Sequence, residues 1–284
     1  MALREPGGVG PKMFQTILAV FGPPENVYGA SADELIDLPQ VSIERAEKIL
    51  SSQHSVQLMS ERIERLSEEG VGVVTYLDDE YPGKLRCMDD PPPVLYFKGT
   101  LPDESRGSVC VIGTTTASPE GIEAAVNISE VLVRHDFAVI SGLARGIDAS
   151  AHVGAIKHEG ETHAVLGCGL FNIYPEENTS LADQITDRGS ILTEFPPDTQ
   201  VSPGLLISRN RIIVGLSDSA IVVELSPDSP GVQSAAEACE MQGKPLFYLL
   251  RGDEDAREIK VPHNAIPFEA LEDVETILKS SIGS

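Results

Sequence analysis

Short apolar runs alternate with helix-like stretches between residues 107 and 250, and this alternation limits the fold more than any other feature of the chain. Because several of the runs are almost wholly apolar, we expect helices to cover both faces of the sheet that they form. The pattern predicts an α/β domain with a doubly wound, mostly parallel sheet. The expected strands are 108–113, 137–141, 162–167, 190–194, 219–225 and 245–250, and the expected helices are 119–134, 146–158, 204–216 and 231–242.

The first 70 residues predict a small helical domain. In its last run, Met59, Ile63 and Leu66 recur at helical spacing, and Gly70 marks the helix end. The segments GVGPK and LPQVSIERAEKI resemble paired helix-hairpin-helix elements, but a sterile-alpha-like docking bundle would show the same pattern.

Residues 71–106 predict a connector that packs on the larger domain. VGVVTYL is an expected strand, and the three prolines at 91–93 impose an extended, stiff path. The Rossmann-like domain then covers residues 107–284 and closes with a helix in FEALEDVETILKS. The sequence therefore predicts three parts.

The composition limits the compartment and the partners. The chain has no apolar run of membrane-spanning length and no apolar signal core at its start, which favours a cytoplasmic protein without a membrane partner. The four cysteines include no CxxC pair, so we expect no metal site. We also expect no cofactor. The formal net charge of −23 argues against a broad basic surface for nucleic acid. It also fits adaptation to high salt, where screening weakens self-repulsion.

The segment SGLARGIDASAH follows an expected strand and opens a helix. Gly142 and Gly146 allow a tight turn after Ser141, and the unpaired N–H groups of the helix start point back at that turn. Such a helix start is an anion site suited to phosphate. Arg145 adds a forked cationic donor, with a structural ion pair as the alternative.

Two further polar residues of this segment have structural interpretations. Asp148 lies in the first helical turn and is expected to act as a cap or dipole partner, not as a catalyst. His152 lies one helical turn further along, and a hydrogen-bonded core histidine is the expected role.

The loop VIGTTTASPEG has the same order of strand, glycine and helix. After Gly113, the hydroxyls of Thr114, Thr116 and Ser118 are candidate donors to a phosphate oxygen. For Ser118, capping of the helix that Pro119 opens is the competing interpretation.

The run SRNRIIVG places Arg209 and Arg211 on either side of Asn210. Residues 107–250 contain only seven lysines and arginines, and three of them fall in this run and in SGLARG. That concentration in an acidic domain favours a local phosphate site. Pairing with Glu194 or Glu224 is the alternative.

The loop VLGCGLFNIYPEEN follows another expected strand. Gly167 and Gly169 turn the chain at the carboxyl edge of the sheet, where open α/β sheets bind ligands. Phe171 or Tyr174 is placed to stack a nucleobase, with packing as the alternative.

Taken together, these blocks resemble the DprA/Smf family, DNA processing protein A. The matching segments occur in the family's order over about residues 76–225: YPGKLRCMDDPPPVLYFKGTL, IGTTTAS, ISGLARGIDASAH, AVLGCGLFNIYPEEN, LTEFPPDT and SRNRIIVGLS. The resemblance implies an extended Rossmann-like fold, a homodimer, binding of single-stranded DNA, and loading of a RecA-type recombinase onto that DNA during DNA uptake and recombination. It does not imply a turnover reaction.

The residues expected to bind DNA or phosphate combine the motif match with the loop chemistry. They are Gly113, Thr114, Ser118, Ser141, Gly142, Arg145, Gly146, Gly167, Gly169, Phe171, Arg209, Asn210 and Arg211. The chain departs from the family pattern at Thr115, where an arginine is usual, and at Ile207, where a proline is usual. With the acidic composition, these departures predict a few focused DNA contacts.

Two alternative functions would use the same phosphate-binding loops. A nucleotide hydrolase or phosphoribohydrolase would need carboxylates, and Glu194 and Glu224 at strand ends are the available ones. A nucleotide-binding sensor would bind without chemistry.

Overall fold

The computed structural model describes residues 1–225, 229–250, 262–263 and 265–281. It divides into two compact units, one formed by residues 1–81 with 85–96 and the other by residues 82–84 with 97–284. Most of the expected connector therefore belongs to the same unit as the N-terminal helices, while the three-part division remains a prediction. No helix of the described residues is both long enough and apolar enough to cross a bilayer.

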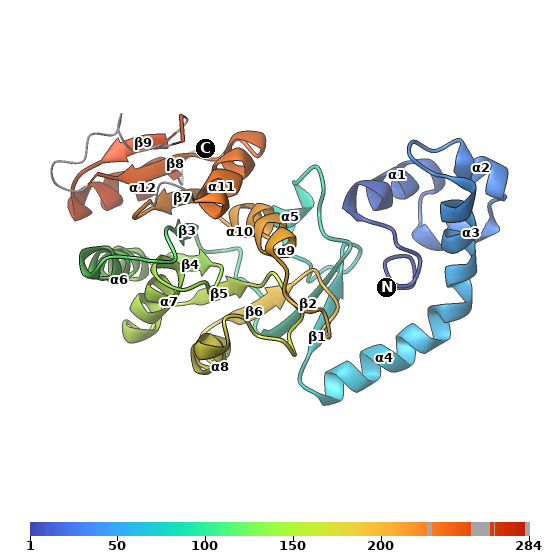
Figure 1. The fold of residues 1–284 in the computed structure, drawn as a ribbon, viewed down its shortest axis with the longest axis horizontal. Helices are drawn as coiled ribbons and strands as arrows, with labels where there is room; N and C mark the ends of the chain where they lie inside the picture. Colours follow the sequence, from blue (N-terminus) through green and yellow to red (C-terminus); the bar gives the residue numbers. More distant parts are fainter. Residues whose placement is uncertain (226–228, 251–261, 264, 282–284) are drawn as a thin grey trace. The chain divides into compact units, whose positions relative to one another are not determined.

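The first unit is built on four α-helices joined by short 3₁₀ turns (Figure 1). Their bounds are α1 (Pro11–Phe21), α2 (Ala32–Ile36), α3 (Ile43–Ser51) and α4 (Val56–Glu68), with 3₁₀ turns at Pro24–Gly29 and Ser52–Ser55. The chain continues through β1 (Gly72–Thr75), α5 (Gly83–Arg86) and β2 (Val94–Gly99).

Local chemistry sets the helix starts in this unit. The Ser31 hydroxyl accepts the Glu34 N–H and the Glu34 carboxylate accepts the Ser31 N–H at 2.8 Å, which forms a capping box at α2. The Ser42 hydroxyl caps α3 by accepting the Arg45 N–H at 3.2 Å. Buried side chains such as Ile17, Leu35 and Ile49 then hold α1, α2 and α3 around one core.

The second unit contains seven neighbouring parallel strands of the sheet (Figure 1). Its strands run in the order β6-β5-β4-β3-β7-β8-β9. Their bounds are β3 (Ser108–Ile112), β4 (Ala138–Ser141), β5 (Thr162–Val165), β6 (Ser190–Thr193), β7 (Ser219–Val222), β8 (Leu246–Leu249) and β9 (Ala265–Phe268). The chain leaves β3 in one direction and returns to its other side at β7, so the topological switch point lies between these two strands.

Helices cover both faces of this sheet, as the apolar strands predict. Helices α6 (Pro119–Arg134), α7 (Ile147–Lys157) and α12 (Leu271–Ser281) share one core with β3, β4, β7 and β8. The other helices of the unit are α8 (Thr179–Thr186), α9 (Pro203–Ser208), α10 (Asn210–Gly215) and α11 (Pro230–Met241), with a 3₁₀ turn at Glu176–Asn178. The predicted doubly wound α/β architecture is confirmed.

Three elements of the second unit beyond residue 97 differ from the sequence predictions. The single helix expected over 204–216 is two helices, α9 and α10, and at their junction the Ile212 N–H donates to the Arg209 carbonyl only three residues back. Helix α8 and strand β9 were not expected. Strand β9 contains Pro267, a residue that weakens any strand pattern, and an edge position accommodates it.

Candidate nucleic-acid interface

A cavity of about 340 Å³ lies at the carboxyl edge of the sheet in the second unit. The residues that line it come from the loops after β3 and β4, from the start of α7, and from α9 and α11. This is the switch point of the sheet, where two neighbouring loops diverge and leave a crevice. The wall contains Ile112, Gly113, Thr115, Gly142, Ala144, Arg145, Asp148, Tyr174, Pro175, Pro203, Leu206, Ile207, Arg209, Asn210, Pro230, Gly231 and Val232.

The turn between β4 and α7 places two charged residues at this cavity. Gly146 has a φ of +71°, a conformation that favours glycine, and its position leaves no room for a Cβ beside the Thr114 carbonyl. The Ile147 N–H donates to that carbonyl at 3.3 Å. The start of α7 is therefore fixed against the loop after β3, with Arg145 just before it and Asp148 in its first turn.

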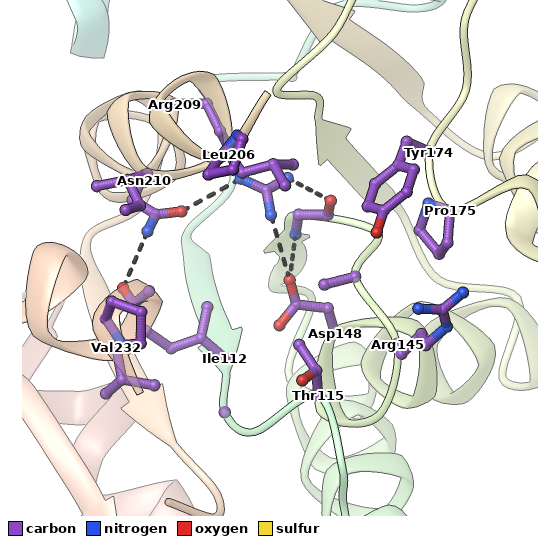
Figure 2. Close-up of a pocket in the computed structure, with 17 residues that line it drawn as sticks. Ile112, Thr115, Arg145, Asp148, Tyr174, Pro175, Leu206, Arg209, Asn210 and Val232 are labelled. Atoms are coloured by element: carbon purple, nitrogen blue, oxygen red, sulfur yellow. Dashed lines mark hydrogen bonds and ion pairs between the residues drawn. The ribbon is translucent and has the colours of Figure 1, made fainter. Parts of the chain in front are cut away.

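Arg209 lies at the inner end of the cavity and is only 5% exposed (Figure 2). Its Nη1 group donates to the carbonyls of Gly142 and Val165, and its Nε donates to Asn210 Oδ1 at 3.2 Å. Asp148 Oδ2 lies 3.8 Å from Arg209 Nη2 and accepts the Gly142 N–H at 3.2 Å. Through these hydrogen bonds Arg209 connects the start of α10 to the ends of β4 and β5.

The Arg209–Asp148 pair is a buried ion pair whose two pKa shifts share one cause. Burial raises the pKa of Asp148 and lowers the pKa of Arg209, and in each case the charge of the partner opposes the shift. The guanidinium remains protonated, because an arginine loses its proton only far above neutral pH. The two side chains therefore face each other at the inner end of the cavity.

Arg145 is the exposed cation of the cavity wall. Its side chain is 53% exposed, and its Nη2 group donates to Glu177 Oε2 at 2.7 Å while Nε donates to Oε1. This two-pronged hydrogen bond raises the pKa of Arg145 and lowers that of Glu177. Figure 2 places Arg145 with Tyr174 and Pro175 at one side of the cavity. The ion-pair alternative considered for Arg145 is therefore present, in an exposed form.

The loop after β3 brings only part of its expected site to the cavity. Gly113 lines the wall, whereas Thr114 is buried and lies 3.2 Å from Thr116 through their hydroxyls. The Ser118 hydroxyl accepts the Gly121 N–H at 3.0 Å and donates to Glu224 at 3.0 Å. The predicted cap at Ser118 is confirmed, and its role in phosphate binding remains a prediction.

Four other expected residues do not line the cavity. The Ser141 hydroxyl is buried and donates to the Val111 carbonyl at 2.7 Å. Gly167 packs against Leu206, and Gly169 packs against the carbonyls of the two prolines before Asp198. Arg211 pairs with the buried Glu194 at 2.6 Å, which is one of the two pairings predicted for it.

Phe171 is 41% exposed on the loop after β5, and Lys98 Nζ lies 5.6 Å from its ring centroid. The Phe171 N–H donates to the Pro197 carbonyl at 3.0 Å, so the backbone beneath the ring is anchored. Tyr174, three residues further on, is 40% exposed and lines the cavity. One loop therefore presents two accessible aromatic rings.

His152 is a core residue, as expected. Thr162 donates its hydroxyl hydrogen to the Val139 carbonyl at 2.8 Å, so its oxygen accepts from His152 Nδ1 at 2.7 Å. Burial lowers the pKa of His152 to about 3, which keeps the ring neutral.

The apolar part of the wall was missed from the sequence. Pro203, Leu206 and Ile207 come from α9, a helix with no buried residue, although its sequence is apolar enough for a core helix. Glu177 was also missed, because nothing local in PEEN identifies its partner 32 residues away. The exposed apolar face of such a short helix becomes a signal only once its neighbours are placed.

The carboxylates considered for hydrolysis are engaged elsewhere. Glu194 pairs with Arg211, and Glu224 accepts hydrogen bonds from Ser118. Within the described part of the chain, Asp148 is the only carboxylate that lines the cavity, and no group of three potential metal ligands is found.

Comparison with known proteins identifies the family. The model of the family DNA recombination-mediator protein A matches residues 72–278, which include the whole cavity wall. The chain belongs to this family. Two relatives are each 35% identical to it: the protein Smf of Synechocystis over 244 residues, 84% of this chain, and the DNA processing protein DprA of Bacillus subtilis over 181 residues, 63% of this chain. The aligned part spans 61% of the length of each of these relatives.

Solved structures of the family share the fold. The DNA processing protein A of Streptococcus pneumoniae aligns with a TM-score of 0.78 at 26% identity, covering 97% of this chain and 95% of the other. The DNA processing protein A of Helicobacter pylori, whose structure concerns its single-stranded DNA binding mode, aligns with a TM-score of 0.64 at 26% identity. That alignment covers 74% of this chain and 96% of the other.

Proposed function

We propose that the chain binds single-stranded DNA through the cavity at the switch point of the sheet and acts as a recombination mediator. The observation that carries the proposal is the wall itself, where an exposed arginine and an exposed tyrosine border an otherwise largely apolar crevice. Such a wall suits a base against the apolar surface and a phosphate beside Arg145. Family membership and the Helicobacter pylori relative support the same ligand.

The contacts divide among a few groups. Arg145 would bind a backbone phosphate by exchanging Glu177 for it, because a phosphate also accepts a forked pair of hydrogen bonds. Tyr174 and Phe171 would each stack a base, and Lys98 beside Phe171 would contact the next phosphate. Gly142 and Arg209 would shape the inner end. The result is a site of few cationic contacts within an acidic molecule.

The partners follow from the family. We infer that the chain forms a homodimer and delivers a RecA-type recombinase to the bound strand, without catalysing a turnover reaction itself. Family membership supports these roles.

Fluorescence anisotropy with a labelled oligonucleotide, from dilute to molar salt, tests the binding proposal. Arg145→Gln should weaken binding and reduce the salt slope by about 0.7, the value for one phosphate contact on a single strand. Arg134→Gln is the matched control, because Arg134 is exposed at the far end of α6. Equal affinity for the two variants and the original chain would exclude the cavity as the DNA site.

A nucleotide-binding sensor is the second candidate, because the cavity volume lies within the usual range for small-molecule sites. It predicts a thermal shift with nucleoside monophosphates and none with oligonucleotides. A shift with oligonucleotides alone would exclude it.

A further inference from the structure

Helix α10 begins beside Arg209 at the cavity and ends at the turn between α11 and β8. At that turn, Lys244 Nζ donates to the carbonyls of Val214 and Gly215, each at 2.8 Å. We propose that Lys244 is a positioning residue for DNA binding, which acts through α10 to hold Arg209 and the adjoining cavity wall in place. The inference rests on the proposed binding of single-stranded DNA at this cavity.

The contacts of Lys244 meet a need of any helix end. The last carbonyls of a helix lack N–H partners inside the helix, and together they form its negative end. An ammonium group supplies both donors and positive charge to such carbonyls. From the same turn, Gln242 Nε2 donates to the Arg211 carbonyl at 2.9 Å. Two side chains of one turn therefore hold the end of α10.

The start of α10 belongs to the cavity wall. Arg209 and Asn210 both line the cavity. Arg209 donates to the carbonyls of Gly142 and Val165, and Asn210 Nδ2 donates to the Gly231 carbonyl at 2.9 Å (Figure 2). The helix has only six residues, so its two ends lie about 9 Å apart. A displacement of its last turn therefore moves the wall.

Apolar packing does not by itself set the position of α10 along its axis. Ile212, Ile213 and Val214 are buried, but apolar contacts are non-directional. Hydrogen bonds have preferred distances and angles, so the bonds from Lys244 define where the helix ends. The same bonds thus define where the guanidinium of Arg209 begins.

The charge of Lys244 depends on its surroundings. Within the described chain, the charged and titratable groups that act on it are Lys84, Asp218, Cys239 and Cys110. Burial lowers the pKa of Lys244 to about 8, the charge of Lys84 adds to this shift, and Asp218 opposes it. Above that pH the neutral amine loses its attraction to the negative end of α10.

Single-strand affinity should therefore fall between pH 7 and pH 9 in the original chain. Lys244→Arg should remove this fall, because arginine stays protonated over the whole range. The comparison needs no destabilising variant, and a structural role without influence on the cavity would not produce it. An equal fall in both proteins would overturn the inference.

Anisotropy of the full chain at neutral pH, with a labelled oligonucleotide, gives a second test. Lys244→Met should lower the affinity about fivefold, a usual size for coupling through packed elements. Lys157→Met removes the same charge from the exposed far end of α7. Val274→Ala weakens the core beneath α12. Both controls should leave the affinity unchanged, and a loss in either that equals that of Lys244→Met would overturn the inference.

The position of Arg209 can also be measured without DNA. Its Nε–H donates to Asn210 Oδ1 at 3.2 Å, and the NMR resonance of this group should shift in Lys244→Met. An unchanged resonance together with unchanged affinity would overturn the inference. If the original chain binds no oligonucleotide while the resonance still shifts, the proposed function fails and the placement of Arg209 by Lys244 holds.

Discussion

Arg209 and Gly142 are bound so closely that the backbone at position 142 has no room for a side chain. The guanidinium of Arg209 donates to the Gly142 carbonyl, and a Cβ added to Gly142 would overlap its central carbon. Asp148 completes the arrangement by accepting the Gly142 N–H and facing Arg209. Gly142, Asp148 and Arg209 therefore hold one another in place at the inner end of the cavity.

Gly142→Ala should destabilise the second unit by about 2–4 kcal/mol. The added methyl group would push the guanidinium away from its carbonyl acceptors and separate a buried ion pair. Chemical denaturation monitored by circular dichroism measures the change. Gly204→Ala is the matched control, because a Cβ at that exposed helical position meets nothing within 4 Å. Equal stability of the two variants would mean that Arg209 is not confined as described.

Glu177→Gln should raise the affinity for single-stranded DNA about threefold, because it removes the carboxylate that competes with a phosphate for Arg145. Anisotropy in dilute salt would detect the change. Glu176→Gln removes the same charge from the neighbouring exposed position and should have a smaller effect. If both variants bind equally, the gain is a general charge effect and not the release of Arg145.

The alternation of strands and helices in the second unit could be predicted from the sequence because the pattern of apolar residues that indicates each element is local. Strands β3, β4 and β7 are short apolar runs separated by helical patterns, and no distant residue is needed to recognise them. The break at Arg209 and strand β9 lack such a signal, since both depend on how neighbouring elements pack.

The sequence predicted where the candidate site lies, but not which partners its charged side chains bind. Gly113, Gly142 and Arg145 were identified because parallel strands bring their carboxyl ends to one edge. Arg209 was expected to contact phosphate, yet its acceptors at Gly142 and Val165 lie 67 and 44 residues away in the sequence. Only the folded structure reveals that its hydrogen bonds are already used.

His152 should make the protein less stable in acid. Its pKa is about 3 in the folded protein and 6.5 without the fold, so the unfolded chain binds the proton first. The stabilisation is present above pH 6.5 and is lost as the pH falls toward 3, by up to about 5 kcal/mol at 1.36 kcal/mol per pH unit. Denaturation between pH 7 and 4 measures it.

His152→Gln keeps a donor for Thr162 and removes the titrating group, so its acid sensitivity should be smaller. The control is His54→Gln, at an exposed position, which should leave the acid response as it was. An unchanged pH profile for His152→Gln would contradict the assignment.

Thr115→Arg should strengthen single-strand binding. Thr115 is exposed and lines the cavity, at the position where the resemblance to the DprA/Smf family leads us to expect an arginine. An added guanidinium would contact one more phosphate and steepen the salt slope by about 0.7. Thr179→Arg, at the exposed start of α8 and outside the cavity wall, is the matched control. A gain that is equal for both variants would reflect net charge alone.

Salt should have opposite effects on stability and on DNA binding. At a formal net charge of −23, carboxylates along the chain repel one another in dilute buffer, and molar salt shortens the screening length to about 3 Å. Thermal unfolding should therefore move to higher temperature in molar sodium chloride, by about 2–4 °C for each kcal/mol gained. Single-strand affinity should fall over the same range, because phosphate contacts release counterions. Equal unfolding temperatures in dilute and molar salt would contradict a high-salt adaptation. The slope of the affinity would then still count the phosphate contacts, because the two measurements depend on different charges.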